Sequence, residues 1–234
     1  MKIMMVEGRY KGQINLSNLD ASKLPNTLGL ATTVQFIDYV DEIKSFLEKH
    51  GKTVFIDKMR QKYEGQLLGC DQGGAEKIKD KVDAFLYFGT GVFHPLGIAI
   101  NVDRDVFCYD PLHGIFSKID SKQVETYNKK RKGAYLKYLH SKEIGMLVSM
   151  KPGQNNFKKA ADMKKQLVAM GKNCYIFVFD TLDFNQIENF PFVECWVNTA
   201  CNRILDDYDK FPRPLVDLSD IEKIEKTQLL TIKK

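Results

Sequence analysis

Two of the five cysteines in this 234-residue sequence stand where an apolar run ends. Cys70 closes the run "GQLLGC" and precedes Asp71, and Cys201 closes "CWVNTAC" two residues before Arg203. Short apolar runs are typical of buried strands, and the loops beyond the carboxyl ends of parallel strands gather functional groups. Because thiolates bind soft metals and iron–sulfur clusters, such a pair could hold one. The competing interpretation is a small buried hydrophobe, the common role of a free cysteine.

The other three cysteines are weaker candidates for a metal site. Cys195 lies six residues before Cys201 on what we predict to be one strand, which separates them by roughly 20 Å at about 3.3 Å per residue. Cys174 is predicted at the start of a strand, the wrong end for a site. We therefore assign Cys195 and Cys174 to the core. Cys108, near the end of "DVFCYDP", stays open as a third ligand or a core residue.

Two segments that would position these cysteines share one pattern. Residues 27–56 and 143–180 each contain an apolar strand, a polar turn with a glutamine, a helix ending in "HGK" or "MGK", and a second strand. In the first helix the 3.6-residue period is kept by Phe36, Tyr39, Val40, Ile43 and Leu47. Gly51 and Gly171 stand where a helix C-cap needs a positive φ. Strands alternating with amphipathic helices predict parallel sheets covered on both faces.

The pattern extends to a third apolar run in each copy, so we expect Cys70 and Cys201 at matching positions of a repeat. The first copy continues through a helix at 75–82, a strand "AFLYFG", a loop with His94, and the strand "DVFCYDP". The predicted fold class is α/β, with two similar parallel-sheet domains and flanking helices. The predicted segments are 1–25 (strand and connecting arm), 26–118 (domain with Cys70), 119–139 (linking basic helix), 140–220 (domain with Cys201) and 221–234 (tail).

Composition narrows the function classes. The net charge of +5 is too small for a dedicated nucleic-acid binder, so the basic residues 129–132 are interpreted as a solvated helix face. No apolar run reaches 18 residues, and the first residues lack the features of a signal peptide. We therefore expect a cytoplasmic protein with no membrane contact. The run "GTGVFHPLG" has neither the spacing of a dinucleotide-binding loop nor a Walker lysine.

Four motifs together carry a family resemblance: "LLGCD", "FGTGVFHPLGIAI", "VSMKPGQ" and "VNTACNRILDDYDKF". In this order and at these distances they resemble the archaeal-type diphthamide biosynthesis enzymes, the 2-(3-amino-3-carboxypropyl)histidine synthases, from about residue 24 to about residue 218. The resemblance implies three similar α/β domains, each giving one cysteine to a [4Fe–4S] cluster whose fourth iron binds S-adenosylmethionine. It implies a dimer and an electron donor. It also implies radical transfer of a 3-amino-3-carboxypropyl group to a histidine of translation elongation factor 2.

The resemblance assigns roles to particular residues of this sequence. Cys70 and Cys201 match the second and third cluster ligands, and the loop close to S-adenosylmethionine matches Lys151, Pro152, Gly153 and Gln154. Gln35 matches the glutamine of the equivalent loop one domain earlier. Arg203 matches the arginine beyond the last ligand, where a guanidinium could hold the methionine carboxylate in a bidentate pair. His94 and Asp71 are assigned a catalytic or loop-shaping role.

The sequence departs from the family pattern in two places. Asn202 stands where the family usually has proline. The 25 residues before the resemblance begins are too few for an α/β domain and contain no cysteine, so we expect the chain to correspond to domains two and three of the family. A third thiolate would then come from Cys108, from a partner chain in a homodimer or a heterodimer with a related chain, or from nowhere.

Four functions remain open at this point. The first is a short diphthamide synthase, favoured because Lys151, Gln154 and Arg203 are retained. The second is a non-catalytic or electron-relay partner subunit of a full-length synthase with no complete cluster of its own, favoured by the missing first cysteine. The third is a related three-domain iron–sulfur enzyme such as quinolinate synthase, whose motifs fit poorly. The fourth is a two-domain binder of a small molecule.

Overall fold

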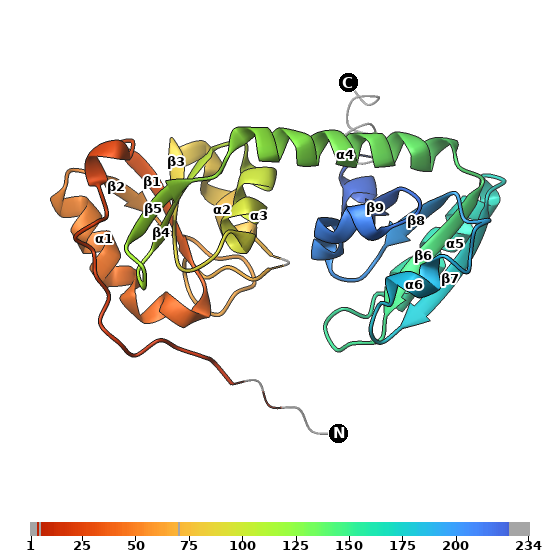
Figure 1. Ribbon diagram of the computed structural model, residues 1–234, viewed down its shortest axis with the longest axis horizontal. Coiled ribbons are helices and arrows are strands. Elements are labelled where there is room, and N and C mark those ends of the chain that lie inside the picture. Colours follow the sequence, from red (N-terminus) through yellow and green to blue (C-terminus); the bar gives the residue numbers. More distant parts are fainter. Residues whose placement is uncertain (1–3, 5, 70, 225–234) are drawn as a thin grey trace. The chain divides into compact units, whose positions relative to one another are not determined.

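The computed structural model describes residues 4, 6–69 and 71–224, and the chain divides into two units, 1–127 and 128–234 (Figure 1). Each unit contains one sheet with helices packed on it, so the predicted α/β class is confirmed. No helix in the described part of the chain combines the length and the apolar character needed to cross a bilayer.

The sheet of the first unit has the strand order β2-β1-β3-β4-β5. Its strands are β1 (Thr27–Thr32), β2 (Thr53–Phe55), β3 (Ala84–Phe88), β4 (Asp105–Asp110) and β5 (Ile115–Lys118). The first four are parallel, and β5 returns antiparallel beside β4 through a short turn. All five residues of β3 are buried, as expected for a central strand that is covered on both faces.

Two separate core clusters cover the two faces of this sheet. Leu28, Leu30 and Leu86 share a cluster with residues of helix α1 (Val40–Lys49), whereas Phe85 and Tyr87 share one with residues of α2 (Gly73–Ile78) and α3 (Phe93–Val102). Figure 1 shows α1 on one side of the sheet and α2 and α3 on the other. The helical period expected along 36–47 is confirmed, because Phe36, Val40, Ile43 and Leu47 are buried. Its first part is a 3₁₀ helix, η2 (Val34–Tyr39), and two further 3₁₀ turns are η1 (Ala21–Lys23) and η3 (Lys79–Lys81).

The predicted loop around His94 is instead the first turn of α3. Pro95 is compatible with that position because the N–H groups of a first helical turn have no intrahelical partner. The predicted N-terminal strand is absent from residues 6–20, which run as an irregular arm over the first core. There the Tyr10 N–H donates to the Gln35 carbonyl at 2.7 Å.

The run "GQLLGC" does not form a third strand. The chain leaves β2 at Phe55 and returns at Gly65, whose φ of 73° turns it out of the extended conformation. The Gly65 carbonyl accepts from the Thr32 N–H at 2.8 Å, and the Leu67 N–H donates to the Thr32 carbonyl at 2.7 Å. This single bridge extends the β2 side of β1. Cys70 itself lies outside the described residues.

The second unit has the strand order β7-β6-β8-β9, all parallel, which repeats the order β2-β1-β3-β4 of the first. Its elements are β6 (Glu143–Ser149), α5 (Phe157–Ala169), β7 (Asn173–Phe179), α6 (Phe184–Ile187), β8 (Cys195–Asn198), η4 (Asn202–Lys210) and β9 (Leu215–Asp217). The predicted repeat is thus confirmed, but the counterpart of β8 is β3. The expected equivalence of the runs "GQLLGC" and "CWVNTAC" is therefore wrong for their described residues, since Gln66 pairs on the β2 side of β1, whereas residues 195–198 form β8.

A glycine–aromatic pair at the same place in both units supports this correspondence. Gly29 on β1 lies opposite Phe85 on β3, and Gly145 on β6 lies opposite Trp196 on β8. A Cβ added to either glycine would overlap the facing ring. In both central strands the glycine therefore leaves a space that the facing aromatic ring fills.

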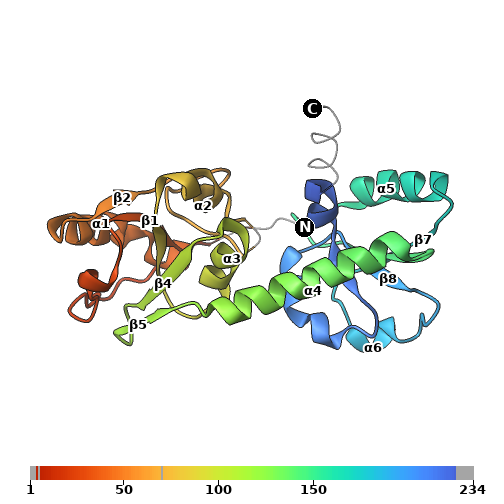
Figure 2. The ribbon, with the colours of Figure 1, turned by 90° about the horizontal axis from the view of Figure 1, so that it is seen from above.

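The predicted basic helix is α4 (Ser121–His140), one uninterrupted helix that carries the chain from the first unit into the second (Figure 2). In the second unit its residues Ala134 and Tyr138 join the core. Residues 221–224 of the predicted tail instead continue a helix that begins at 218, and Ile221 is 1% exposed in that core. The rest of the predicted tail, 225–234, lies outside the described residues.

Both amphipathic helices of the repeat end in the same C-cap. Gly51 and Gly171 have φ of 76° and 77°, as predicted. The Lys52 N–H donates to the Leu47 carbonyl at 3.1 Å, and the Lys172 N–H donates to the Leu167 carbonyl at 3.0 Å. These are the six-to-one bonds of a Schellman motif.

Replacing Gly171 with alanine should lower the free energy of unfolding by about 1 kcal/mol, because an L-residue is strained at positive φ. Gly133→Ala, in α4, is the matched control: a Cβ at either site meets no atom within 4 Å, but Gly133 is helical. That change should raise the free energy of unfolding by about 0.5–1 kcal/mol. Urea denaturation measures both, and a stabilising Gly171→Ala would contradict the assigned cap.

Candidate functional site

The predicted site residues gather at the carboxyl edges of the two sheets, one set in each unit. In the first unit Gln35 follows β1 and His94 follows β3, and in the second the loop of Lys151 follows β6 and Cys201 follows β8. Each pair of strands is adjacent and parallel, so the loops that leave it emerge together.

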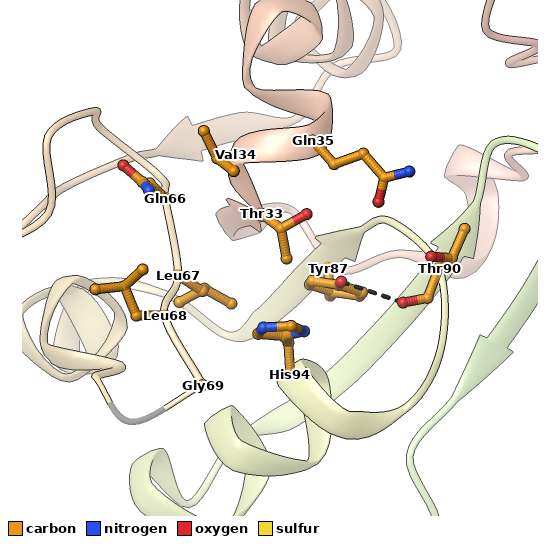
Figure 3. Close-up of a pocket in the computed structure, with 10 residues that line it drawn as sticks. All are labelled: Thr33, Val34, Gln35, Gln66, Leu67, Leu68, Gly69, Tyr87, Thr90 and His94. Atoms are coloured by element: carbon orange, nitrogen blue, oxygen red, sulfur yellow. Dashed lines mark hydrogen bonds between the residues drawn. The ribbon is translucent and has the colours of Figure 1, made fainter. Parts of the chain in front are cut away.

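A cavity of about 350 Å³ lies at this edge of the first unit (Figure 3). It contains two of the predicted residues, Gln35 and His94, and Gly69, the chain neighbour of Cys70. None of its ten described lining residues carries a formal charge: Thr33, Val34, Gln35, Gln66, Leu67, Leu68, Gly69, Tyr87, Thr90 and His94. Amide, hydroxyl and imidazole groups among apolar side chains suit an uncharged polar ring or chain better than a phosphate.

The Tyr87 and His94 rings stack in this cavity, with centroids 6.1 Å apart and an angle of 15° between their planes (Figure 3). The Phe93 ring meets His94 edge-on at 5.1 Å. Tyr87 is 1% exposed, and burial raises the pKa of its phenol above the ordinary value. Tyr87 therefore stays protonated and keeps a donor at the cavity wall, where its Oη donates to the Thr90 carbonyl at 3.4 Å.

The described residues on either side of position 70 are joined by hydrogen bonds. Leu68 and Asp71 exchange two backbone hydrogen bonds of 3.2 and 3.1 Å. The Asp71 carboxylate accepts from the Gly73 N–H at 2.9 Å, at the start of α2. The buried Gln72 donates to the carbonyls of Leu68 and Gly69, each at 3.1 Å. These contacts give Asp71 a loop-shaping role.

In the second unit the loop after β6 carries the predicted Lys151, Pro152, Gly153 and Gln154, of which the first three are exposed and Gln154 is half-buried. Gly153 has a φ of 79°, which favours glycine there. The Asn156 side chain at the end of this loop donates to the Thr199 carbonyl at 2.7 Å. That bond ties the loop after β6 to the segment leading to Cys201.

Cys201 lies three residues beyond the end of β8, so it is past the strand rather than on it. It is half-buried and directly precedes η4. Its carbonyl accepts from the Asn198 Nδ2 at 2.8 Å and from the Ile204 N–H at 3.0 Å. Both bonds hold the backbone that presents the thiol.

The two residues after Cys201 differ in their partners. Asn202 buries its Oδ1 without a hydrogen-bond partner among the described residues. Arg203 binds the Asp206 carboxylate through Nε at 2.8 Å and Nη2 at 2.7 Å, and its side chain is 9% exposed. Both contacts reach the same carboxylate oxygen, Oδ2 of Asp206.

The remaining described cysteines belong to the cores. Burial raises the pKa of Cys108 to about 12, of Cys174 to about 11 and of Cys195 to about 12. The core assignment of Cys174 and Cys195 is confirmed. Cys108 is 7% exposed and packs in the cluster that contains Tyr87, which favours the core alternative for it as well.

Cysteine thiols are the type of ligand that a thiolate-bound cluster needs. The described residues alone, however, do not form a complete site. Among residues 4, 6–69 and 71–224, no three histidine, cysteine or acidic side chains come together as metal ligands. Cys201 is the one described cysteine outside a core. Cys70, the other predicted ligand, lies outside the described residues.

Sequence reasoning missed three residues of these sites: Tyr87, Asn198 and Asp217. Tyr87 reads as one aromatic among several in a buried strand. Asn198 and Asp217 are buried polar residues on apolar strands, and that interruption of the apolar pattern was the available signal.

Comparison with known proteins gives one consistent result. A family model described as "Putative diphthamide synthesis protein" matches residues 6–228. The chain is 34% identical over 206 residues to a 2-(3-amino-3-carboxypropyl)histidine synthase of Pyrococcus horikoshii, covering 87% of this chain and 58% of that protein. A protein of the same name from Methanocaldococcus jannaschii is 33% identical over 189 residues, with coverages of 75% and 54%.

Solved structures agree with this match. The crystal structure of Dph2 from Pyrococcus horikoshii with a 4Fe-4S cluster matches with a TM-score of 0.73 and 31% identity, covering 88% of this chain and 61% of that one. The chain thus spans somewhat more than half the length of the relatives it matches.

Thiol alkylation should separate the cysteines. A thiol with a pKa near 12 is on the order of 10⁻⁴ thiolate at pH 8, so iodoacetamide should modify Cys201 at least about tenfold faster than Cys108, Cys174 and Cys195. Peptide mass spectrometry of the metal-free protein follows each site, and the same protein in urea is the control in which the rates converge. A Cys108 rate equal to that of Cys201 would contradict the core assignment.

Proposed function

Because the chain belongs to the diphthamide synthesis protein family, we propose that it acts in the first step of diphthamide biosynthesis. The reaction is the transfer of the 3-amino-3-carboxypropyl group from S-adenosylmethionine to a histidine of translation elongation factor 2, in the cytoplasm. The observation that carries this proposal is the placement of Cys201. Its thiol lies past the carboxyl edge of a parallel sheet, beside Arg203 and next to a loop tied to that of Lys151.

Under this proposal Cys70 and Cys201 are two thiolate ligands of a [4Fe–4S] cluster. The third thiolate comes from a related chain in a homodimer or heterodimer, because Cys108 is buried and its thiol stays protonated. When bound, the cluster supplies the electron that starts radical cleavage of S-adenosylmethionine, and a separate electron donor restores it.

The side chains of this protein bind and orient the reactants. Arg203 exchanges Asp206 for the carboxylate of the methionine moiety, and the loop of Lys151, Pro152, Gly153 and Gln154 covers the same edge of the sheet. In the first unit the cavity lined by Gly69 and His94 contributes Gln35 to the binding of S-adenosylmethionine. His94, half-buried at its wall, is the candidate acceptor for the proton that leaves the modified imidazole.

A second candidate function is a non-catalytic or electron-relay partner of a full-length synthase. One observation favours it: the described residues offer one cysteine outside the cores. The two functions differ in one property. Only the enzyme takes up a cluster that it needs in order to bind S-adenosylmethionine.

Anaerobic reconstitution with iron and sulfide tests the cluster directly. We expect about four irons per cluster for the wild type. Cys70→Ala and Cys201→Ala should each lose most of this iron, because each removes a thiolate. Cys174→Ala, a buried residue of the same type, is the matched control and should keep it, as should Cys108→Ala. A wild type that takes up no iron, alone or mixed with a full-length relative, would exclude the enzyme and leave a partner subunit.

Arg203→Ala should weaken S-adenosylmethionine binding to the cluster-loaded protein roughly ten- to hundredfold, since hydrogen bonds to a charged group are worth about 1.5–3 kcal/mol. Arg203→Lys should recover only part of this, because an ammonium cannot form the bidentate pair.

Asp206→Ala is the matched control for this experiment, because it breaks the same ion pair but keeps the guanidinium. Binding to the Asp206→Ala variant should be unchanged or tighter. Anaerobic calorimetry measures all three variants. If Arg203→Ala binds as tightly as the wild type, the assignment of Arg203 to the carboxylate is wrong.

A further inference from the structure

The side chain of Asn198, at the end of β8, is fully committed to three hydrogen bonds. Asn198 is 0% exposed. Its Nδ2 donates to the Cys201 carbonyl and to the Asp217 Oδ2, each at 2.8 Å, and its Oδ1 accepts from the Ala200 N–H at 3.0 Å. One amide group therefore spans the whole turn between the strand and the cysteine.

Asp217 accepts one hydrogen of this amide. It is the register partner of Asn198 on the neighbouring strand β9 and is 5% exposed. Its Oδ1 accepts from the N–H and Oγ of Ser219, at 2.9 and 2.6 Å. The Ala200 N–H can only donate, so the Oδ1 of Asn198 must face it, and the NH₂ group then faces the Asp217 Oδ2 and the Cys201 carbonyl.

The far side of this network is anchored in the fold. Ser219 belongs to the helix at 218–224, whose Asp220 forms a two-point ion pair with Arg131 of α4. The helix that directly follows Asp217 is thus held by a second, independent contact.

We propose that Asn198 is a positioning residue for Cys201, with Asp217 holding its amide. Asn198 holds the Cys201 backbone so that the thiol keeps one direction past the sheet edge, as outer-shell groups do for metal ligands. That this direction of the thiol serves to bind a cluster rests on the proposed function. The positioning of the thiol by Asn198 does not rest on it.

An exchange of the two side chains separates positioning from stability. In Asn198→Asp alone, two carboxylates face each other in the core. In Asn198→Asp with Asp217→Asn, the new asparagine can accept from Ser219 and donate to the new aspartate, so the cross-strand bond is restored. The Cys201 carbonyl still loses its side-chain donor, because an ionised aspartate has none.

The deciding readout is the rate of Cys201 alkylation by iodoacetamide in the metal-free protein, divided by the mean rate of the core residues Cys174 and Cys195. We expect the double variant to unfold near the wild-type urea midpoint but to raise this ratio at least threefold. A rise below threefold in the folded double variant overturns the proposal, because Asn198 would then serve only the bond between strands.

A double variant that does not fold is recognised by fast alkylation of Cys174 and Cys195, and Asn198→Ser then decides by the same threefold criterion. Serine is smaller and cannot reach both Cys201 and Asp217. Iron uptake by the wild type is measured in parallel. Its failure would remove the proposed function, whereas the alkylation ratio would still decide the role of Asn198.

Discussion

The parallel pairing of two central strands in each unit is the constraint on which both sites depend. β1 pairs with β3 and β6 pairs with β8, so the carboxyl ends of each pair lie at one edge of the sheet. Gln35 and His94 follow one pair, and the Lys151 loop and Cys201 follow the other. Parallel neighbours require crossover helices, and these bury the strands and leave their ends as the places for polar chemistry.

This arrangement also divides the cysteines by chemistry. A thiol within a strand is surrounded by the apolar side chains that stabilise the sheet, and burial keeps it protonated, as for Cys108, Cys174 and Cys195. Cys201 differs from Cys195 by six positions along the chain, yet it has passed the strand end and entered a turn held by hydrogen bonds. The same sequence run therefore contains a core residue and a residue available for ligation.

Local signals in the sequence predicted the local structure well. The glycine C-caps, the helical stripe from Phe36 to Leu47 and the repeat of strand and helix each depend on residues a few positions apart. The predictions that failed depend on contacts between residues far apart in the sequence. An apolar run shows that a segment is buried but not which strand it joins, so "GQLLGC" was assigned a strand of its own. The hydrogen bond between Asn198 and Asp217 joins residues 19 positions apart, and no periodic pattern in the sequence predicts it.

In the pairs Gly29–Phe85 and Gly145–Trp196, the residue at one position limits which substitutions the other position can accept. Once a ring occupies the space above the glycine, alanine is blocked at that site until the ring has first become smaller. A ring reduced first would leave a void and lose stability. Whichever of the two residues is substituted first, the intermediate protein is less stable. The two positions of each pair are therefore expected to change together or not at all.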